Sequence, residues 1–255
     1  MTATDQEIKY HENVVSNDQG KTDLVMVSYF RKDLTQKTLE RLIEVTKTPH
    51  RLTVVDNGSD DKTKDYLMNM VRFGHIQNLI ILDRNYGLEY ARNTALRHIH
   101  SKYCVFFDND LLAPRLEPDW LSQQIVLMEK YPEYGCLALR PQVLVGAVEH
   151  LEEANEDVIP NNHVGATFMM FPTVLLKEVG WSEDFTNRVA DWRLGDILKE
   201  KSLKMGWCRN IRCYHIFGKN WSYPEGVEHF HREIWPPAEN YDNIKVDPDT
   251  LIPLS

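Results

Sequence analysis

Two carboxylates separated by one residue follow an apolar, aromatic-rich run near the middle of the chain. The run Tyr103-Cys104-Val105-Phe106-Phe107 is typical of a buried strand, and Asp108-Asn109-Asp110 follows it. Side chains at i and i+2 of an extended segment point the same way, so these two carboxylates can converge on one object. Mg²⁺-type ions are held by one or two carboxylates plus substrate phosphate oxygens. The pattern therefore favours a divalent-ion site beside a nucleotide, although turn-forming residues after a core strand would look the same.

Four short apolar segments alternate with helical patterns in the first half of the chain. We expect strands at 24–27, 52–55, 79–82 and 103–107. Between them the sequence predicts a helix with Asp33 as its N-cap, a second helix over roughly 61–72, and a third from Leu88 to Ile99. Strands that alternate with helices indicate βαβ units. The predicted fold class is α/β, with a mostly parallel central sheet flanked by helices.

Polar residues follow each of these four strands. They are Ser28 and Arg31, Asp56 and Asn57, Arg84 and Asn85, and Asp108 and Asp110. In parallel sheets, ligands bind beyond the carboxyl ends of the strands, so we expect a small-molecule site along this edge. Neither a G-x-G-x-x-G fingerprint nor a G-x-x-x-x-G-K-[ST] loop is present. A metal ion must then carry more of the phosphate binding.

The remainder of the chain extends this domain. We expect a helix from Pro118 to Tyr131, strands at 136–139 and 164–171, a helix opening at Asp191, and two short strands over 206–213 before His215. The predicted organisation is a flexible tail (1–21), one domain (22–215, with a nucleotide-binding half 22–110 and an acceptor half 111–215 that has a small antiparallel portion), and an irregular extension rich in proline and aromatic residues packed on it (216–255).

Bulk composition excludes several function classes. The net charge of −9 argues against a protein that grips nucleic acid by its phosphates. No apolar run approaches the ~18–20 residues of a membrane span, and no basic amphipathic helix is evident, so at most a peripheral membrane contact is expected. The four cysteines lack metal-site spacing, which favours core thiols and a cytoplasmic protein. The sequence does not fix the oligomeric state.

Five motifs in a fixed order give the chain a family resemblance. They are Val54-Val55-Asp56-Asn57-Gly58-Ser59-Asp60-Asp61, Asn85-Tyr86-Gly87 with Ala91-Arg92-Asn93, Asp108-Asn109-Asp110, Gly180-Trp181-Ser182-Glu183-Asp184-Phe185 with Asp191, and His215. With these residues the chain resembles glycosyltransferase family 2, the inverting, metal-dependent enzymes of the GT-A fold. The resemblance covers about Leu24 to His215 and implies a single GT-A domain.

The resemblance implies a role for each matching position. Asp56 would face the nucleotide base with Ser28 and Tyr29 nearby, and Arg92 would reach the nucleotide from its helix. Asp108 would sit against the ribose or the metal, Asp110 would ligate the ion, and His215 would complete its protein ligands. The implied ion is Mn²⁺ or Mg²⁺. The expected donor-binding set also includes Arg31, Asn57, Asn85, Gly87 and Asn109.

The implied reaction moves a sugar from a nucleoside diphosphate to a hydroxyl of a carbohydrate or glycoconjugate acceptor, as in polysaccharide or glycoconjugate biosynthesis. Asp191 matches the catalytic base, with Glu183 and Asp184 as rivals. Two positions depart from the family. Arg31 ends a first turn that usually reads Pro-Thr-Tyr-Asn, and Ala190 stands where a glutamate usually precedes the base. The Gln-x-x-Arg-Trp of processive synthases is missing, which favours a single transfer per encounter.

Two other classes remain open on these residues. Ala190 and the altered first turn are compatible with a nucleotide-sugar binding module that has lost turnover. A nucleotidyltransferase that makes the sugar nucleotide would also use metal-bound carboxylates. The lack of a basic, Gly-rich phosphate loop disfavours that second class.

Overall fold

The four predicted N-terminal strands lie side by side in one parallel sheet. The computed structural model describes residues 9–12, 20–141, 155–165, 167–183 and 190–216. Within them, β2 (Thr22–Ser28), β3 (His50–Asp56), β4 (Asn78–Ile81) and β5 (Tyr103–Asp108) are ordered β4-β3-β2-β5. The register aligns Ser28 with Asp56, and Val27 with Asp108. The carboxyl ends of these strands therefore meet at one edge.

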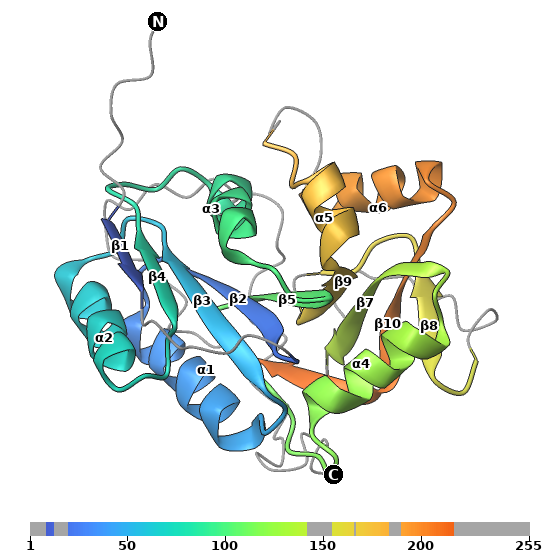
Figure 1. The fold of residues 1–255 in the computed structure, drawn as a ribbon, viewed down its shortest axis with the longest axis horizontal. Coiled ribbons are helices and arrows are strands. Elements are labelled where there is room, and N and C mark those ends of the chain that lie inside the picture. Colours follow the sequence, from blue (N-terminus) through green and yellow to red (C-terminus); the bar gives the residue numbers. More distant parts are fainter. Residues whose placement is uncertain (1–8, 13–19, 142–154, 166, 184–189, 217–255) are drawn as a thin grey trace, which may run out of the picture.

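The strand order reverses at β2. From β2 the chain steps outward to β3 and β4, and then returns to place β5 on the other side of β2 (Figure 1). Such a reversal leaves a crevice beyond the carboxyl ends of the two central strands, and ligands bind there in open α/β sheets. The segments that follow β2 and β5 thus flank the expected binding position.

Helices cover both faces of this parallel sheet. α1 (Lys32–Val45) and α2 (Asp61–Arg72) lie on one face, and α3 (Leu88–Ala95), which ends in a 3₁₀ turn (Leu96–His98), lies on the other (Figure 1). Leu24 and Met26 of β2 pack into the core on the α1 side, and Val25 and Val27 pack on the α3 side. This alternation is the period-2 pattern of a strand buried on both faces.

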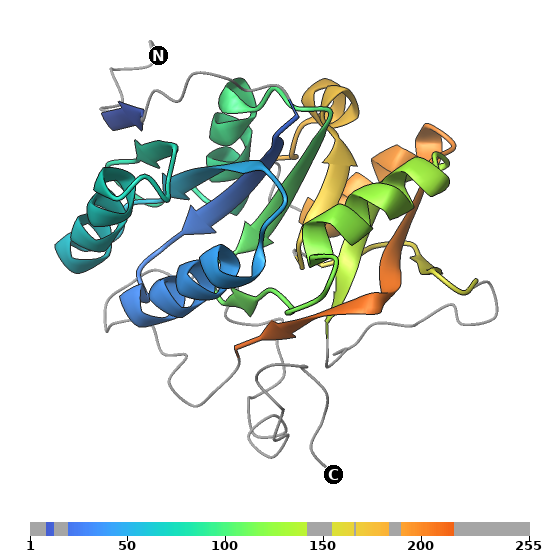
Figure 2. The ribbon, with the colours of Figure 1, turned by 60° about the horizontal axis from the view of Figure 1, so that its bottom comes forward.

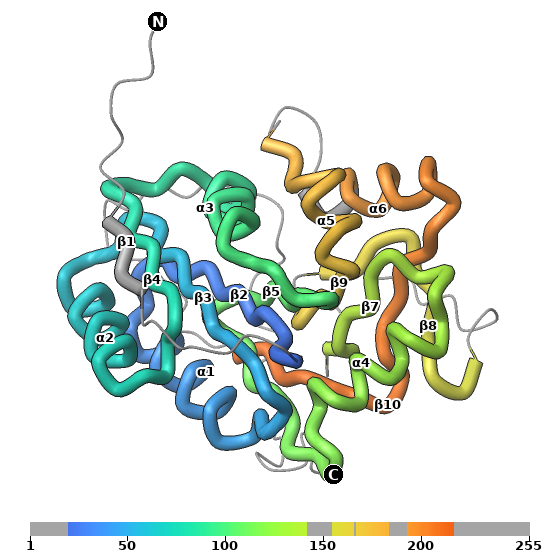
Figure 3. Tube along the Cα trace, in the orientation of Figure 1, coloured from blue at the N-terminus to red at the C-terminus, as the bar shows by residue number. Residues whose placement is uncertain are grey.

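The second half of the chain extends the same sheet with mixed strand directions. Its elements are β6 (Leu111–Leu112), α4 (Trp120–Lys130), β7 (Tyr134–Pro141), β8 (Val158–Asn161), β9 (Met169–Pro172), α5 (Thr173–Val179), α6 (Ala190–Glu200) and β10 (Lys204–His215). The sheet order continues β5-β9-β7-β10-β6, with β9 antiparallel to β5 and β8 antiparallel to β10. Figure 3 traces the chain through both halves.

Four local features differ from the sequence predictions. The strand expected at 164–171 is shorter and begins only at Met169, as β9. Lys9–Glu12, inside the segment predicted as a loose tail, form β1, which pairs antiparallel with β4. The two short strands expected after residue 206 are one long strand, β10, whose register against β7 shifts between Cys208 and Arg212. The helix expected to be capped by Asp33 begins at Lys32, with Arg31 at the N-cap position.

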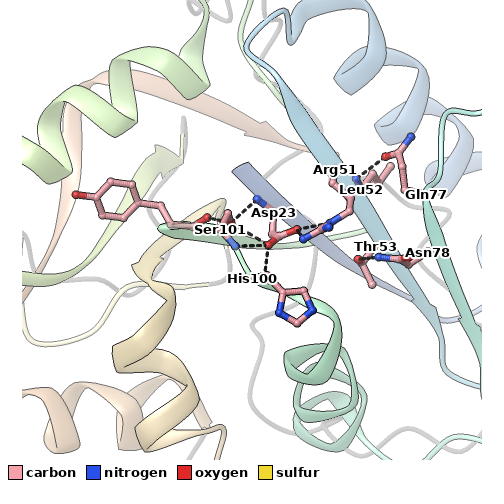
Figure 4. Close-up of polar contacts among 9 residues, drawn as sticks. Asp23, Arg51, Leu52, Thr53, Gln77, Asn78, His100 and Ser101 are labelled. Atoms are coloured by element: carbon pink, nitrogen blue, oxygen red, sulfur yellow. Dashed lines mark hydrogen bonds and ion pairs between the residues drawn. The ribbon is translucent and has the colours of Figure 1, made fainter. Parts of the chain in front are cut away.

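A buried carboxylate joins three segments at the amino end of the sheet. Asp23 of β2 accepts hydrogen bonds from the Arg51 guanidinium (2.7 Å) and from the backbone amides of His100 (2.6 Å) and Ser101 (2.9 Å) (Figure 4). Burial alone would raise the pKa of Asp23, but the hydrogen bonds from Arg51 and the two amides outweigh it, so the pKa is lowered. This cluster lies at the opposite end of β2 from the polar edge and holds the sheet together.

The observed architecture is a single α/β domain with a mixed, curled sheet flanked by helices, as predicted. All four cysteines are buried and free, which confirms the prediction of core thiols. No described helix combines the length and apolar character that a membrane crossing requires. Most of the predicted tail, residues 1–8 and 13–19, and the extension from residue 217 onward lie outside the described residues.

Candidate functional site

Arg31 and Asp110 meet where the strand order reverses. Arg31 follows β2 and Asp110 follows β5, and their side chains form an ion pair with 3.0 Å between Nη1 and Oδ2. The second guanidinium nitrogen of Arg31 donates to Asn109 Oδ1, also at 3.0 Å. The two terminal guanidinium nitrogens of Arg31 thus contact two consecutive residues of the turn that follows β5. The Arg31 guanidinium therefore joins the segment that follows β2 to the segment that follows β5.

The turn that carries Arg31 has an unusual backbone. Phe30 and Arg31 both have positive φ, 50° and 53°, in the left-handed region that non-glycine residues rarely enter. Ser59 Oγ accepts a hydrogen bond from Phe30 N (2.8 Å), and the Arg31 carbonyl accepts from Leu34 N and Thr35 N at the start of α1. These contacts fix the turn, which directs the Arg31 side chain across the crevice.

Asp110 is also in contact with the carboxyl end of β10. His215 Nε2 lies 3.0 Å from Asp110 Oδ1, although the two residues are 105 positions apart. The pairing of β10 with β6 aligns His215 with Leu111, and Ile216 N donates to the Asp110 carbonyl. Figure 2 shows that β10 is strongly bent, and its carboxyl half runs past the end of β7, with which it pairs up to Cys213, to reach β6. Sheet pairing therefore brings together two residues that the resemblance assigned to one ion.

Asp110 is a buried carboxylate with a side-chain contact on each oxygen, His215 on Oδ1 and Arg31 on Oδ2. Its side chain is 4% exposed. Burial would raise its pKa, but the charge and hydrogen bond of His215, followed by those of Arg31, outweigh burial, so the pKa of Asp110 is lowered. The carboxylate is therefore ionised and compensated within the protein.

Asp108 takes a different direction from Asp110. Its Oδ1 pairs with Arg92 Nη2 of α3 at 3.3 Å, and the buried Arg92 guanidinium lies 4.5 Å from the centre of the Trp181 ring. Among the described residues, no three His, Cys, Asp or Glu side chains gather as a metal site. The predicted trio is therefore not assembled: Asp110 and His215 come together, and Asp108 joins Arg92 on the α3 side.

The reason for this difference lies in the backbone. β5 ends at Asp108, and Asn109 and Asp110 form a turn rather than continuing the strand. The i, i+2 rule holds only while the chain is extended, so it does not apply across this boundary. Asn109 is instead fixed by its side chain, which donates to Thr35 Oγ1 of α1 at 2.8 Å. Thr35 also lies 3.4 Å from Ser28 Oγ.

Asp56 lies at the carboxyl end of β3 and is fully buried. Its Oδ2 accepts from Ser59 N at 3.0 Å, whereas its Oδ1 is buried with no hydrogen-bond partner. Burial raises the pKa of Asp56 to about 6, against the opposing effect of the Ser59 hydrogen bonds. A buried acceptor with an unused oxygen is costly in a folded protein, so Oδ1 is available to accept a hydrogen bond from a further donor.

Asn57, Asn85 and Gly87 form a brace between two loops. Asn57 Nδ2 donates to Asn85 Oδ1 (2.9 Å) and to the Gly87 carbonyl (3.1 Å), and Asn57 Oδ1 accepts from Tyr86 N (3.0 Å). Gly58 has φ of 79°, and a Cβ there would lie 2.3 Å from the Arg84 carbonyl carbon. The sequence predicted this group as donor-binding, and the structure shows side chains that hold the loop after β3 against the loop after β4.

The catalytic-base candidates are placed only in part. Asp191 is the second residue of α6, but its side chain and that of Ala190 lie outside the described residues, as does all of Asp184. Glu183 Oε1 accepts a hydrogen bond from Asn93 Nδ2 at 2.7 Å. Asn93 also donates to the Trp181 carbonyl and accepts from Trp181 N, so it fixes this segment against α3.

Two residues with structural parts in the site, Thr35 and Ser59, were not predicted from the sequence. Thr35 and Ser59 carry the hydrogen bonds described above. Trp181 is 3% exposed and packs against Phe106 and Phe171 beneath Arg92, so it belongs to the core. The only signal for Ser59 was its place in the Asp56 motif, and nothing in the sequence marked Thr35.

The geometry matches a known family and fold. Residues 23–159 match the model of "Glycosyl transferase family 2". The chain is 25% identical over 114 residues to TuaG of Bacillus subtilis (strain 168), a glycosyltransferase named for teichuronic acid biosynthesis. This alignment covers 45% of the chain and 44% of TuaG, so the chain spans less than half of that relative.

Solved structures share the fold at low sequence identity. A mannosyltransferase from Pyrobaculum calidifontis, in complex with GDP-Man and Mn²⁺, has a TM-score of 0.62 at 18% identity and covers 79% of this chain and 58% of its own. S. aureus TarS 1–349 in complex with UDP-GlcNAc has a TM-score of 0.60 at 16% identity and covers 76% and 58%. Because the family model covers more than half of the chain, the protein belongs to glycosyltransferase family 2.

Proposed function

We propose that the protein transfers a sugar from a nucleoside diphosphate donor to a hydroxyl of a carbohydrate or glycoconjugate acceptor, with inversion at the anomeric carbon and one transfer per encounter. The observation that carries this proposal is the buried Asp110 carboxylate at the point where the strand order reverses, in contact with His215. The structural relatives in complex with GDP-Man and UDP-GlcNAc support a nucleotide-sugar donor. The free core thiols favour a cytoplasmic setting.

The Asp110–His215 pair fits a divalent ion. Asp110 Oδ1 and His215 Nε2 lie 3.0 Å apart, and this carboxylate oxygen and imidazole nitrogen are the atoms that would hold the ion. When bound there, Mn²⁺ or Mg²⁺ would supply Lewis-acid charge to the diphosphate leaving group. An imidazole ligand favours Mn²⁺, because nitrogen donors suit transition metals and oxygen donors suit Mg²⁺.

Asp56 would select the base. An ionised carboxylate only accepts hydrogen bonds, and the unused Oδ1 requires an N–H from the ligand. Uracil, thymine and guanine present a ring N–H on the pairing edge, whereas adenine and cytosine do not. We therefore expect a UDP-, dTDP- or GDP-linked donor. The brace around Asn57 would hold the neighbouring loops around the nucleotide.

Arg92 and Asp108 would act together on the ribose side. The Arg92 guanidinium is fixed by the Trp181 ring and pairs with Asp108, whose side chain is 34% exposed. The more exposed member of the pair is the carboxylate, which can accept a ribose hydroxyl. Arg92 then positions Asp108.

Asp191 would remove the proton from the acceptor hydroxyl. A positioned carboxylate base contributes typically about 10²–10⁴-fold to rate. Attack from the side opposite the diphosphate leads to inversion. Asp191 opens α6, which follows the segment fixed by Asn93 against α3.

Replacing Asp191 with Asn tests the reaction assignment. We expect product formation to fall at least 100-fold while donor affinity changes less than threefold. Asp196→Asn, an exposed position of the same helix, should leave both unchanged. If the wild-type protein binds donor but consumes it with no acceptor, the protein is a binding module. Pyrophosphate release from a nucleoside triphosphate and a sugar phosphate would instead indicate a nucleotidyltransferase.

A further inference from the structure

Arg31 places a permanent positive charge where the donor's diphosphate is expected. Its guanidinium spans Asn109 and Asp110 at the reversal of the strand order. Arginine remains charged at all physiological pH values, and its fork suits phosphate as well as carboxylate. The turn ends in Arg31 where the first turn of the family that the chain resembles usually ends in Asn, so a charged side chain stands in place of a neutral one.

The contacts that His215 and Arg31 make with Asp110 are on different oxygens. His215 is on Oδ1 and Arg31 is on Oδ2. A metal ion on the Oδ1–His215 side therefore does not require Arg31 to leave Oδ2. Arg31 would remain as a second cation on the same carboxylate. The Arg31 side chain is 12% exposed and that of Asp110 is 4% exposed, so the Arg31 side chain is the more accessible of the two.

The backbone indicates that this placement is held at a cost. Two consecutive non-glycine residues, Phe30 and Arg31, occupy the left-handed region. Such conformations cost about 1 kcal/mol or more each and persist only where the surroundings enforce them. Here Ser59 Oγ holds Phe30 N, and Ser59 N in turn donates to Asp56. The turn that presents Arg31 is thus coupled by two hydrogen bonds to the expected base-binding carboxylate.

We propose that Arg31 is a diphosphate-binding residue that gives this protein substantial nucleotide affinity without a divalent ion. The proposal rests on the proposed donor site. Arg31 contacts the diphosphate directly and shares with the metal the task of neutralising it. The consequence is a smaller gain in nucleotide affinity from Mn²⁺ than the Asp110–His215 pair alone would give.

The test measures binding of UDP, GDP and dTDP by calorimetry in EDTA and in Mn²⁺. Arg31→Asn is the informative variant, because Asn removes the charge and tolerates the left-handed backbone. Lys32→Gln is the matched control, because it removes one charge from the next residue without touching Asp110. Arg31→Lys keeps the charge and loses the fork, and it should lie between wild type and Arg31→Asn.

For Arg31→Asn we expect nucleotide affinity in EDTA to fall about 10- to 100-fold, as for a charged hydrogen bond to phosphate. Affinity in Mn²⁺ should fall less, so the ratio of the affinity in Mn²⁺ to the affinity in EDTA rises. Structural damage would lower both equally and leave the ratio unchanged, which overturns the proposal. Wild-type binding in Mn²⁺ but none in EDTA also overturns it and leaves the proposed function intact. No nucleotide binding by the wild type in either condition refutes the proposed function itself.

Discussion

Asp56→Asn should stabilise the nucleotide-free protein while weakening nucleotide binding. The pKa of Asp56 is raised from 3.8 to about 6, mainly by burial. The folded state therefore pays for ionising this carboxylate at neutral pH. A rise of about two pH units corresponds to about 3 kcal/mol. The Asn side chain keeps an oxygen that can accept from Ser59 N, but its buried NH₂ group has no acceptor. This lowers the free energy of unfolding by about 1 kcal/mol. We therefore expect the free energy of unfolding of Asp56→Asn to exceed that of wild type by about 2 kcal/mol at pH 8.

The sign of this effect depends on pH. Below the unfolded pKa of 3.8, Asp56 is protonated in both states and its burial costs nothing. Between 3.8 and about 6 the wild type loses stability as pH rises, and above 6 the full cost is present. The variant should thus be slightly less stable than wild type near pH 4 and more stable at pH 8. Ser59, Lys64 and Asp60 are the groups that also act on this carboxyl.

Urea denaturation at pH 4 and pH 8 measures this crossover. Asp60→Asn is the control, since Asp60 is an exposed N-cap of α2 whose pKa is lowered, first by the Thr63 side-chain hydrogen bond. It should lose a little stability at pH 8. Nucleotide affinity of Asp56→Asn should fall at least tenfold at pH 8, and wild-type affinity should fall as pH drops below 6. An Asp56→Asn variant less stable than wild type at pH 8 would refute the reasoning.

Three further perturbations follow from the structure. Asp23→Asn should cost about 3 kcal/mol of folding free energy, because the Asn oxygen can still accept from the two amides but the Arg51 guanidinium loses its charged partner. Urea denaturation that shows no loss would contradict the cluster's role. Gly58→Ala should lose more stability than Gly20→Ala in thermal melts. Both glycines have positive φ, but only at Gly58 would an added Cβ lie within 4 Å of other atoms, the backbone of Arg84 and Asn85. Equal losses would exclude the close approach. His215→Ala should raise the Mn²⁺ concentration needed for half-maximal nucleotide binding at least about tenfold, whereas the exposed His75→Ala should not; equal effects would exclude a ligand role.

The alternation of apolar segments was sufficient to predict the parallel half of the sheet. Each of those strands is buried on both faces, so its hydrophobic run is continuous and short, and the polar residues that follow it lie at one edge. Asp56 could be placed at this edge from the sequence alone. The contact between Asp110 and His215 could not, because it depends on β10 pairing with β6 across 105 residues, and only the family resemblance implied it.

The different directions of Asp108 and Asp110 after β5 have a local cause. A strand pattern does not reveal the residue at which the extended backbone ends, and here it ends at Asp108. Asp108 therefore pairs with Arg92, whereas Asp110 pairs with Arg31. The left-handed turn at Arg31 was also beyond sequence reasoning. No glycine or asparagine marks it, because hydrogen bonds from other elements enforce it.

Nucleotide titration of wild type and Asp110→Asn in the presence of Mn²⁺ tests the central claim most directly. The claim is that the carboxyl edge of β2, β3 and β5, with Asp110 at its centre, binds the diphosphate of a nucleotide sugar. We expect wild type to bind at least one of UDP, GDP and dTDP. The factor by which Mn²⁺ raises nucleotide affinity should be at least tenfold smaller in Asp110→Asn than in wild type. Equal gains from Mn²⁺ in the two proteins would contradict the claim.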